Sequence, residues 1–518
     1  MQNNPTSYDL VAYPGYTHPQ THPNRLAVIG SLFGLEPAPV DHCRVLELGC
    51  GNGNNLIPMA FRLPASEFIG IDLAGLPVAQ GRRMITELGL TNVELLHGSV
   101  TEFEARGKFD YIIAHGLFSW VSAPIRDHIL ALCRHCLAPQ GIAFISYNTL
   151  PGSHLRNMLR EMMLFHVRGF ADPQERVRQA QALVKFLADS QDTPDEYRRW
   201  MKGESDAILG HEPGHLYHDE LAEISEPFSF TQFIQQAGAH GLNYVGEADY
   251  FEMFDHSFKD RTREVLNQLG QNRILREQYL DFLKCRRFRQ TLLCHSEAPL
   301  KPEPMAERIP RFFISSSAKC APGDADLMPG KIVAYQTDKG AGCATDYPPG
   351  KAALGALNAS HPIPLPFEYL MQKAAATLAA AGVAVESDHP LREKLSAFLL
   401  ELYSAGAVEF RAVAPPACAI SERPLVNRLT RWQIEHGNLV TSQFHLPVKI
   451  EDEIGRCLLT SMDGTLDRHA LLEKIWQLLT SKNPLNARDQ DQSDLRRQVE
   501  ADLDRNLDKL ARLGLLAG

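Results

Sequence analysis

The sequence predicts an α/β fold in which helices cover both faces of a mainly parallel sheet. Strand-like apolar runs alternate with helix-like segments between residues 44 and 147, a glycine-rich turn follows the first run, and an acid ends the second. This alternation is typical of parallel sheets, which bind ligands at the carboxyl ends of their strands. The predicted strands are 44–49, 67–72, 93–97, 109–114 and 142–147, and the predicted helices are 53–63, 76–88 and 124–137.

The first predicted strand ends in three glycines at alternate positions, Gly49, Gly51 and Gly53. Glycines in such a turn permit positive φ and let the backbone approach a ligand closely. The second strand ends in Asp72, where a carboxylate can accept two hydrogen bonds from a ribose diol. The two signals together indicate a nucleoside site.

The details of the glycine turn argue against a dinucleotide. A dinucleotide fingerprint needs a third glycine where this chain has Asn54. Glu47, just before the turn, would repel a pyrophosphate and suits a cationic or amino-bearing ligand instead. A dinucleotide enzyme and a chance glycine turn stay open as alternatives.

The pattern Glu-x-Gly-x-Gly-x-Gly from Glu47 to Gly53, with Asp72 after it, resembles motif I of the class I S-adenosylmethionine-dependent methyltransferases. The resemblance implies a Rossmann-like seven-stranded sheet and S-adenosyl-L-methionine as cofactor. It places Ser99 where many relatives carry an aspartate that accepts from the adenine amino group, and the Val100 N–H at adenine N1. The cofactor-binding residues that it implies are Glu47, Gly49, Cys50, Gly51, Gly53, Asp72, Leu73, Ser99, Val100 and His115.

The fourth and fifth predicted strands end in polar and aromatic residues. In the family, the loop after the fourth strand flanks the methyl group, so His115, Phe118 and Trp120 are candidates to line the site. The alternative is that the two aromatic residues belong to the core and that His115 is a hydrogen-bonded buried histidine. Tyr147 and Asn148 lie where the fifth strand leaves the sheet, at the same edge.

A proline- and tyrosine-rich arm precedes the first strand and, with a predicted helix at 24–35, forms a first segment of residues 1–43. Its prolines exclude a regular helix in the arm. Tyr8, Tyr13 or Tyr16 could close over the cofactor, because aromatic faces favour cations. A tail that simply packs on the surface is the alternative.

Further phrases narrow the resemblance, among them Tyr13-Pro-Gly-Tyr16, Ser146-Tyr-Asn-Thr-Leu-Pro-Gly152 and Leu216-Tyr-His-Asp-Glu220. They are similar to methyltransferases with a methyltransferase regulatory domain, a group that includes rickettsial protein lysine methyltransferases acting on outer-membrane protein B. The resemblance implies methyl transfer to lysine side chains of a protein, and the candidate catalytic residues are Tyr13, Tyr16, His115, Tyr147 and Asn148. A methyltransferase for a small molecule or RNA, and a non-catalytic cofactor-binding scaffold, are the alternatives.

Residues 44–152 form the predicted catalytic core, and residues 153–225 a helical insertion. Residues 226–296 are expected to complete the sheet with two more strands, at 242–251 and 288–294. The segment His211-Glu-Pro-Gly-His215 has the letters of a metalloprotease motif, but Pro213 and Gly214 forbid the continuous helix that the motif needs, so no metal is predicted. The basic run 284–289 is interpreted as a solvated approach to the last strand.

A proline-rich linker at 297–309 separates this part from two modules, 310–413 and 425–518. In the first, predicted helices are followed by a short strand pair, which suggests a winged helix. The second resembles another helical or winged-helix module. We expect these modules to contact proteins or to form a homodimer.

Composition limits the class of partner. The 518-residue chain is 44% apolar and 22% charged, with a net charge of -10 and a pI near 6.1. Nucleic acid is therefore an unfavoured partner. Ten scattered cysteines fit a reducing compartment, and Cys133 and Cys136 fit apolar helix positions. No signal peptide or membrane span is evident, so we expect no membrane insertion and a cytoplasmic location.

Overall fold

The structure is a computed structural model that describes residues 6–11, 13–104, 106–190, 195–321, 326–414, 418, 420–482 and 492–517. The chain divides into two compact units. The first comprises residues 1–16 and 33–303, and the second comprises residues 17–32 and 304–518. Within the described residues, no helix is both long and apolar enough to span a bilayer.

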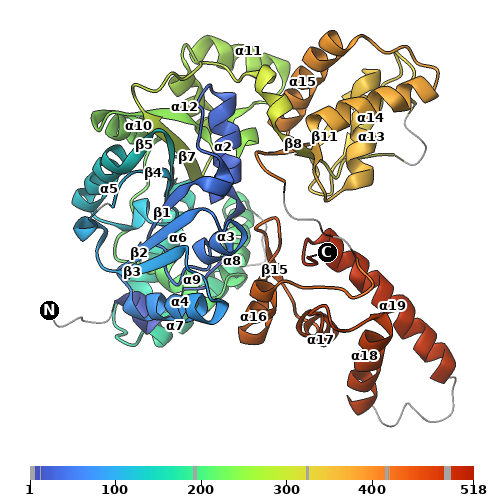
Figure 1. The fold of residues 1–518 in the computed structure, drawn as a ribbon. Coiled ribbons are helices and arrows are strands. Elements are labelled where there is room, and N and C mark those ends of the chain that lie inside the picture. The colour runs from blue at the N-terminus through green and yellow to red at the C-terminus, as the bar shows by residue number, and fades with distance from the viewer. Residues whose placement is uncertain are drawn as a thin grey trace. The chain divides into compact units, whose positions relative to one another are not determined.

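The first unit is built on a seven-stranded sheet in the order β3-β2-β1-β4-β5-β7-β6 (Figure 1). The strands β1 to β5 run parallel, whereas β7 is antiparallel to both of its neighbours. This order confirms the predicted seven-stranded α/β class, including the two strands expected from residues 226–296. The strands are β1 (Arg44–Leu48), β2 (Glu67–Asp72), β3 (Val93–His97), β4 (Phe109–Ala114), β5 (Leu137–Asn148), β6 (Leu242–Glu247) and β7 (Phe288–His295).

Parallel strands covered on both faces read as continuous apolar runs, and the central strands here do so. Val45, Leu46 and Leu48 of β1 are fully buried. One core joins β1, β4 and β5 to helices α5 (Ala123–Cys136) and α10 (Phe230–Ala239). Cys133 and Cys136 lie in this core, at the apolar helix positions predicted for them. Helices α3 (Leu56–Arg62) and α4 (Gly75–Leu88) make the first two crossovers between parallel strands.

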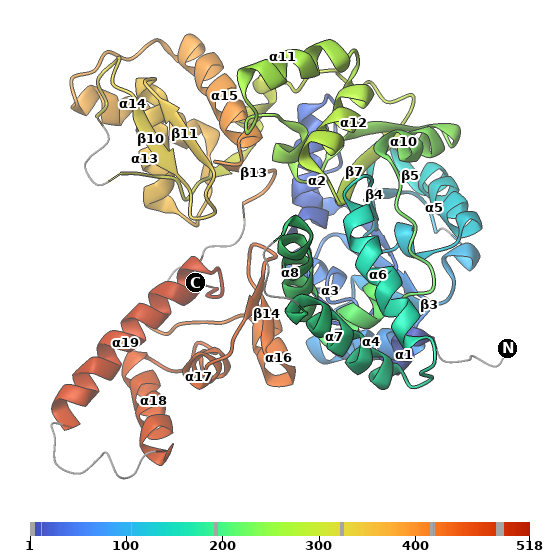
Figure 2. The same ribbon diagram turned by 180° about the vertical axis from the view of Figure 1, so that it is seen from behind.

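The predicted insertion between β5 and β6 is helical. Helices α6 (Ser153–Val167), α7 (Pro173–Asp189) and α8 (Glu196–Leu209) pack in sequence and are best seen in Figure 2. They enclose a core of their own that includes Leu159, Val184 and Ile208. The short helix α9 (Pro213–His215) follows and continues into the π-helical turn η5 (Leu216–Glu220).

The basic run 284–289 is only partly solvated. Arg287 is exposed, in line with the interpretation, whereas Arg286 and Arg289 are buried, and for these two the interpretation was wrong. The Arg289 side chain is fully buried and donates to Glu247 of β6 and to Glu277 and Asp281 of helix α12 (Arg273–Lys284). Arg286 is also buried and pairs with Asp281. Lys284 and Arg286 both reach Glu252, and Arg287 pairs with Glu204 of α8, so five acids in all neutralise the run. This network ties α12 to the last two strands.

Helix α2 (Pro23–Leu32) groups with the second unit rather than with the arm that precedes it. The Asn24 side chain at the start of this helix holds residues 412 and 413: its Oδ1 accepts from the N–H of Ala412 and Val413, and its Nδ2 donates to the Val413 carbonyl. The predicted first segment of residues 1–43 is thus divided between the two units. Its tyrosine-containing part and residues 33–43 belong with the sheet, whereas residues 17–32 do not.

The rest of the second unit contains two modules. In the first, the helices α13 (Pro348–Ser360), α14 (Phe367–Ala380) and α15 (Asp388–Ser404) accompany a three-stranded sheet, β12-β8-β13. Its strands are β8 (Phe313–Ser315), β12 (Leu365–Pro366) and β13 (Glu409–Arg411), and a second sheet holds β9 (Lys319–Cys320), β10 (Val333–Gln336) and β11 (Gly342–Thr345).

The last module combines helices with one hairpin. The hairpin pairs β14 (Leu439–Thr441) with β15 (Pro447–Lys449). The helices are α16 (Arg428–His436), α17 (Glu453–Ser461), α18 (Arg468–Lys482) and α19 (Gln492–Arg512). Their apolar faces share one core that includes Leu507 and Leu510 of α19. A small helical domain with a β-wing results.

Replacing Arg289 tests the buried network. We expect Arg289→Ala to lower the free energy of unfolding by about 3–5 kcal/mol, because it leaves buried carboxylates without their cation. Urea denaturation followed by circular dichroism measures the loss. Arg83→Ala, which removes an exposed pair with Glu87, is the matched control and should leave the urea midpoint essentially unchanged. Equal losses in the two variants would contradict the importance of the network.

Candidate functional site

The glycine turn after β1 has the backbone that was predicted for it. Gly49, Gly51 and Gly53 have φ values of 73°, 54° and 73°, which are unfavourable for residues with a Cβ. The N–H groups of Gly49 and Cys50 donate to the Ile71 carbonyl, so the turn is held against β2. Among the described residues, no atom lies within 4 Å of the Cβ that Gly51 would carry, so the turn borders open space.

Asp72 fixes the same turn from the end of β2. Its Oδ2 accepts from the Gly51 N–H at 2.8 Å, and its Oδ1 accepts from the Ala74 N–H at 2.8 Å. Burial raises the pKa of this carboxyl, while the two backbone donors oppose the shift. A carboxylate offers about four acceptor positions, so two remain for a ligand. Leu73, beside it, leaves 60% of its surface exposed at this strand end.

Glu47 lies buried beneath the turn. Its Oε1 accepts from the Asn55 side chain at 2.7 Å, whereas no donor of the described chain reaches Oε2. Burial raises the pKa of Glu47 to about 8. A buried carboxyl with one oxygen still free to accept a hydrogen bond would repel a phosphate but can bind an amino group.

The third strand ends in an open turn. Ser99 and Val100 are half-buried, and the Ser99 hydroxyl accepts from the Thr101 N–H and shares a 2.7 Å hydrogen bond with the Thr101 hydroxyl. Within the described structure, nothing lies within 4 Å of a Cβ built on Gly98. The side chain of Cys50 packs toward Gly70 under the glycine turn and is buried, so only its backbone is available to a ligand of the turn.

His115 ends β4 at the same edge and is half-buried. Its ring lies 5.8 Å from that of Phe144 and 6.0 Å, edge to face, from that of Phe288. Phe118, by contrast, is fully buried in the core, which settles its alternative in favour of packing. Trp120 is half-buried in the following turn.

Tyr147 is not at the site, and this part of the prediction was wrong. Its side chain is 1% exposed, stacks on Phe233 at 4.1 Å and shares a 3.1 Å hydrogen bond with Thr291. Successive side chains of a strand point to opposite faces, and Tyr147 is on the face that α10 covers. Asn148, half-buried, is on the other face, and its N–H donates to the Ser119 hydroxyl.

The N-terminal arm lies over these strand ends. Asp9 of helix α1 (Ser7–Leu10) accepts from the Leu76 N–H at the start of α4, four residues after Asp72. The Gly15 carbonyl accepts from the side chain of Asn54 in the glycine turn. The arm is therefore fastened on both sides of the nucleoside edge. Asn54 stands where a dinucleotide fingerprint would have glycine, and its side chain holds the arm on the glycine turn.

The arm also packs on the segment 213–220, which sequence analysis did not select as a site. Tyr8 stacks on His218 with ring centres 4.0 Å apart and an angle of 5°, and Tyr16 stacks on His215 at 5.5 Å. Tyr13 meets both histidines edge to face. The Tyr13 hydroxyl donates to Asp219. The sequence signal that could have indicated this segment is Leu216-Tyr-His-Asp-Glu220. Above, that phrase supports only the resemblance to the family and no site.

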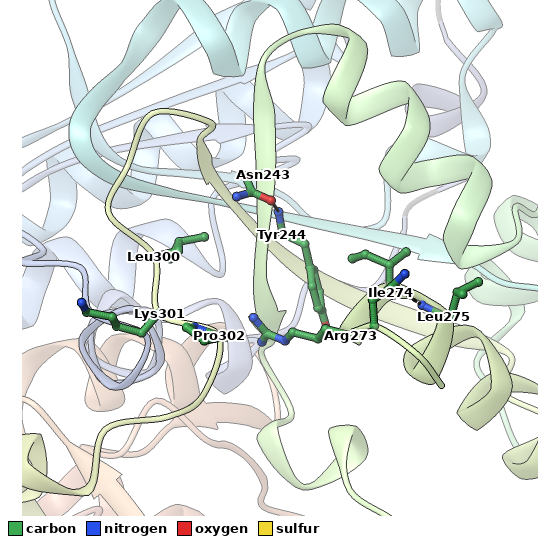
Figure 3. Close-up of a pocket in the computed structure, with 9 residues that line it drawn as sticks. Asn243, Tyr244, Arg273, Ile274, Leu275, Leu300, Lys301 and Pro302 are labelled. Atoms are coloured by element: carbon green, nitrogen blue, oxygen red, sulfur yellow. Dashed lines mark hydrogen bonds between the residues drawn. The ribbon is translucent and has the colours of Figure 1, made fainter. Parts of the chain in front are cut away.

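A separate hollow of about 620 Å³ lies elsewhere on the first unit, between β6, the start of α12 and residues 300–302 (Figure 3). The Arg273 guanidinium lies 4.7 Å from the Tyr244 ring and 4.0 Å from that of Phe33. None of the predicted site residues lines this hollow. The nucleoside site is assigned to the strand ends instead.

Three family models match the chain. The methyltransferase domain matches residues 45–141, the "Predicted methyltransferase regulatory domain" matches residues 212–295, and the "PKMT, C-terminal winged helix domain" matches residues 422–515. These assignments agree with the glycine turn, with the segment that completes the sheet and with the last module.

Individual proteins extend the similarity to nearly the whole chain. A protein of Rickettsia prowazekii, uncharacterized protein RP789, is 30% identical over 478 residues, which cover 90% of this chain and 85% of the relative. A second protein of that organism, RP028, is 40% identical over 46% of this chain and 95% of its own length. The structure of PKMT2 from Rickettsia typhi in complex with AdoHcy is similar with a TM-score of 0.85 and 28% identity, covering 98% of this chain and 100% of that one.

The family predicted from the motifs is thereby confirmed. Its glycine turn, its acid at the end of β2 and its seven-stranded sheet are all present in the first unit. The chain belongs to the class I S-adenosylmethionine-dependent methyltransferases that carry a regulatory domain and a PKMT winged-helix domain.

Proposed function

We propose that this methyltransferase transfers methyl groups to lysine side chains of a protein. The observation that carries the proposal is the similarity over 98% of the chain to a rickettsial PKMT, together with an aromatic and acidic lining above the cofactor edge. Such a lining favours a cationic amine. Four points stay predictions. They are that the methyl acceptor is a protein, that the chain is cytoplasmic, that nucleic acid is a disfavoured partner, and that the C-terminal modules form a homodimer.

The residues at the strand ends fit S-adenosylmethionine. The two remaining acceptor positions of Asp72 suit the ribose diol, and the unpaired Oε2 of Glu47 suits the amino group of the methionine tail. The space at Gly51 admits the tail, and the open turn at Gly98, Ser99 and Val100 admits the adenine. Leu73 offers an apolar contact beside the ribose. When bound, the cofactor supplies an activated methyl group on a sulfonium.

The chain's own task is to position an amine and to free it of its proton. A free lysine has a pKa near 10.4 and reacts only when uncharged. Desolvation among aromatic rings lowers an amine pKa, and a neighbouring acceptor takes the proton. Holding the amine in line with the methyl group supplies much of the rate acceleration. Tyr13, Tyr16, His115 and Asn148 are the proposed lining residues for this step.

Asp72 is the first residue to test. We expect Asp72→Ala to weaken S-adenosylhomocysteine binding by about 100-fold, because two hydrogen bonds to a charged acceptor are lost. Isothermal titration calorimetry measures the affinity. Glu67→Ala, which removes the acid at the opposite end of the same strand, is the control and should bind normally. Unchanged binding by Asp72→Ala would show that the nucleoside lies elsewhere.

Gly98 tests whether the open turn after β3 holds the ligand. A Cβ at this position meets no neighbour in the described structure, so Gly98→Ala should leave the melting temperature of the ligand-free protein within a few degrees, about the effect of a neutral surface change. The same side chain should weaken S-adenosylhomocysteine binding at least about tenfold by filling the adenine space. Thermal melts with and without ligand measure both effects. If S-adenosylhomocysteine raised the melting temperature of the variant as much as that of the wild type, the turn after β3 would not be part of the ligand site.

The methyl acceptor is tested by labelling. The full-length chain is incubated with tritiated S-adenosylmethionine and a cell lysate, which is then separated into protein, RNA and metabolite fractions. We expect label in protein and methyl-lysine in its hydrolysate by mass spectrometry. Label confined to RNA or metabolites would favour those substrates, and cofactor binding without any label would favour a non-catalytic scaffold.

A further inference from the structure

The regulatory domain contributes a carboxylate to the space beside the cofactor edge. Asp219 lies on the π-helical turn η5, a rare backbone form that is frequent at functional sites. A π-helical turn contains one residue more than an α-helical turn. Here the side chains of His218, Asp219 and Glu220 contact different partners. His218 stacks on Tyr8 of the arm, and Glu220 accepts from Arg156 of α6 at 2.7 Å. Asp219 accepts from the Tyr13 hydroxyl.

Two tyrosines of the arm, Tyr8 and Tyr13, lie within electrostatic range of this carboxylate, and Tyr16 lies close to Tyr13. The hydroxyls of Tyr8 and Tyr16 are close enough to Tyr13 for their charges to raise its pKa, after burial and Asp219. The pKa of Tyr8 is raised to about 12 by burial, by Asp219 and by Asp72, in that order. Tyr8 is thus within electrostatic range of both the regulatory-domain acid and the nucleoside acid. As whole residues, Tyr8 and Tyr13 are 38% and 39% exposed, so packing does not close either of them off completely.

The nearest strong cation is already committed to other acids. Arg156 donates to Glu220 and also approaches Glu204 at 3.6 Å, and both of these glutamates are buried. Asp219 therefore faces hydroxyls and aromatic rings rather than a direct arginine partner. One carboxylate, several hydroxyl acceptors and aromatic faces are the groups that complement a compact ammonium with three donors.

We propose that Asp219, with the hydroxyl of Tyr13, binds the ammonium of the acceptor amine and takes its proton before methyl transfer. In the reaction the amine loses one proton to the Asp219 carboxylate, and its lone pair forms the nitrogen–carbon bond as the carbon–sulfur bond breaks. The electron pair of that bond stays on sulfur. The proton leaves from Asp219 to water. This proposal rests on the proposed amine substrate and makes the regulatory domain part of the active site.

Burial raises the pKa of Asp219 to about 7, with the charge of Glu220 adding to the effect and Arg156 and Tyr13 opposing it. Below that pH the carboxyl is neutral and neither attracts an ammonium nor accepts a proton. His215 and His218, which pack on the same tyrosines, have pKa values lowered by burial and stay neutral at pH 7. Amine binding should therefore weaken as the pH falls through about 7.

The test uses n-butylammonium, which is the lysine side chain without its backbone, and the full-length chain saturated with S-adenosylhomocysteine. Ligand-observed NMR gives the affinity between pH 6 and pH 8, and n-butanol is the uncharged control. We expect Asp219→Asn to weaken n-butylammonium at least tenfold at pH 8 and to abolish its pH dependence. Tyr13→Phe should weaken it several-fold. Glu223→Gln removes an exposed acid four residues away and should change nothing.

Affinity for S-adenosylhomocysteine, measured on the same variants, should stay within twofold and shows that the fold is intact. Wild-type affinity for n-butylammonium in Asp219→Asn, or no saturable binding to the wild-type chain, overturns the proposal. Binding that depends on Asp219, without methyl-lysine in the labelling assay, would support the ammonium site and reject only the protein-lysine substrate. If Asp219→Asn also fails to bind S-adenosylhomocysteine, the Tyr13→Phe variant provides the test. Unchanged affinity of Tyr13→Phe for n-butylammonium would then overturn the proposal that Tyr13 and Asp219 bind the ammonium together.

Discussion

The carboxylate of Asp72 holds together the part of the molecule on which its chemistry depends. It joins the glycine turn after β1 to the start of α4 through one backbone N–H from each. The strand ends and the arm are arranged about this point, since Asp9 accepts from the same helix start and Gly15 is held by Asn54 of the turn. Parallel strands bring their carboxyl ends to one edge, so a single acid can organise residues far apart in sequence.

The regulatory domain is structurally inseparable from the catalytic sheet. Its strands β6 and β7 complete the sheet, and the buried Arg289 network fixes α12 against them. Its first residues, around the π-helical turn, meet the arm through stacked tyrosines and histidines. The same domain thus finishes the scaffold and, by our proposal, supplies a group for the acceptor amine.

Most of the fold and the cofactor edge followed from local patterns. The glycine turn, the acid at the end of β2 and the two late strands have sequence signals that depend on neighbouring residues only, and all were found as expected. Tyr147 failed because its face of the sheet is covered by α10, whose Phe233 comes from a part of the chain that no local pattern connects to β5. Arg289 failed because its acidic partners come from β6 and α12, which no local pattern connects to it.

The arm illustrates the limit of such inference. Its tyrosines were expected over the cofactor, but their partners His215, His218 and Asp219 lie about 200 residues away and carry no periodic signal. Helix α2, continuous in sequence with the arm, belongs to the other unit through Asn24 and residues 412–413. Long-range contacts of this kind require the folded structure.

A crystal structure of the full-length chain with S-adenosylhomocysteine tests the central claim most directly. The account predicts the ribose on Asp72, the amino group beside Glu47 and the sulfur facing the arm and Asp219. Nucleoside density in the hollow beside Arg273, with the glycine turn closed by side chains, would contradict it.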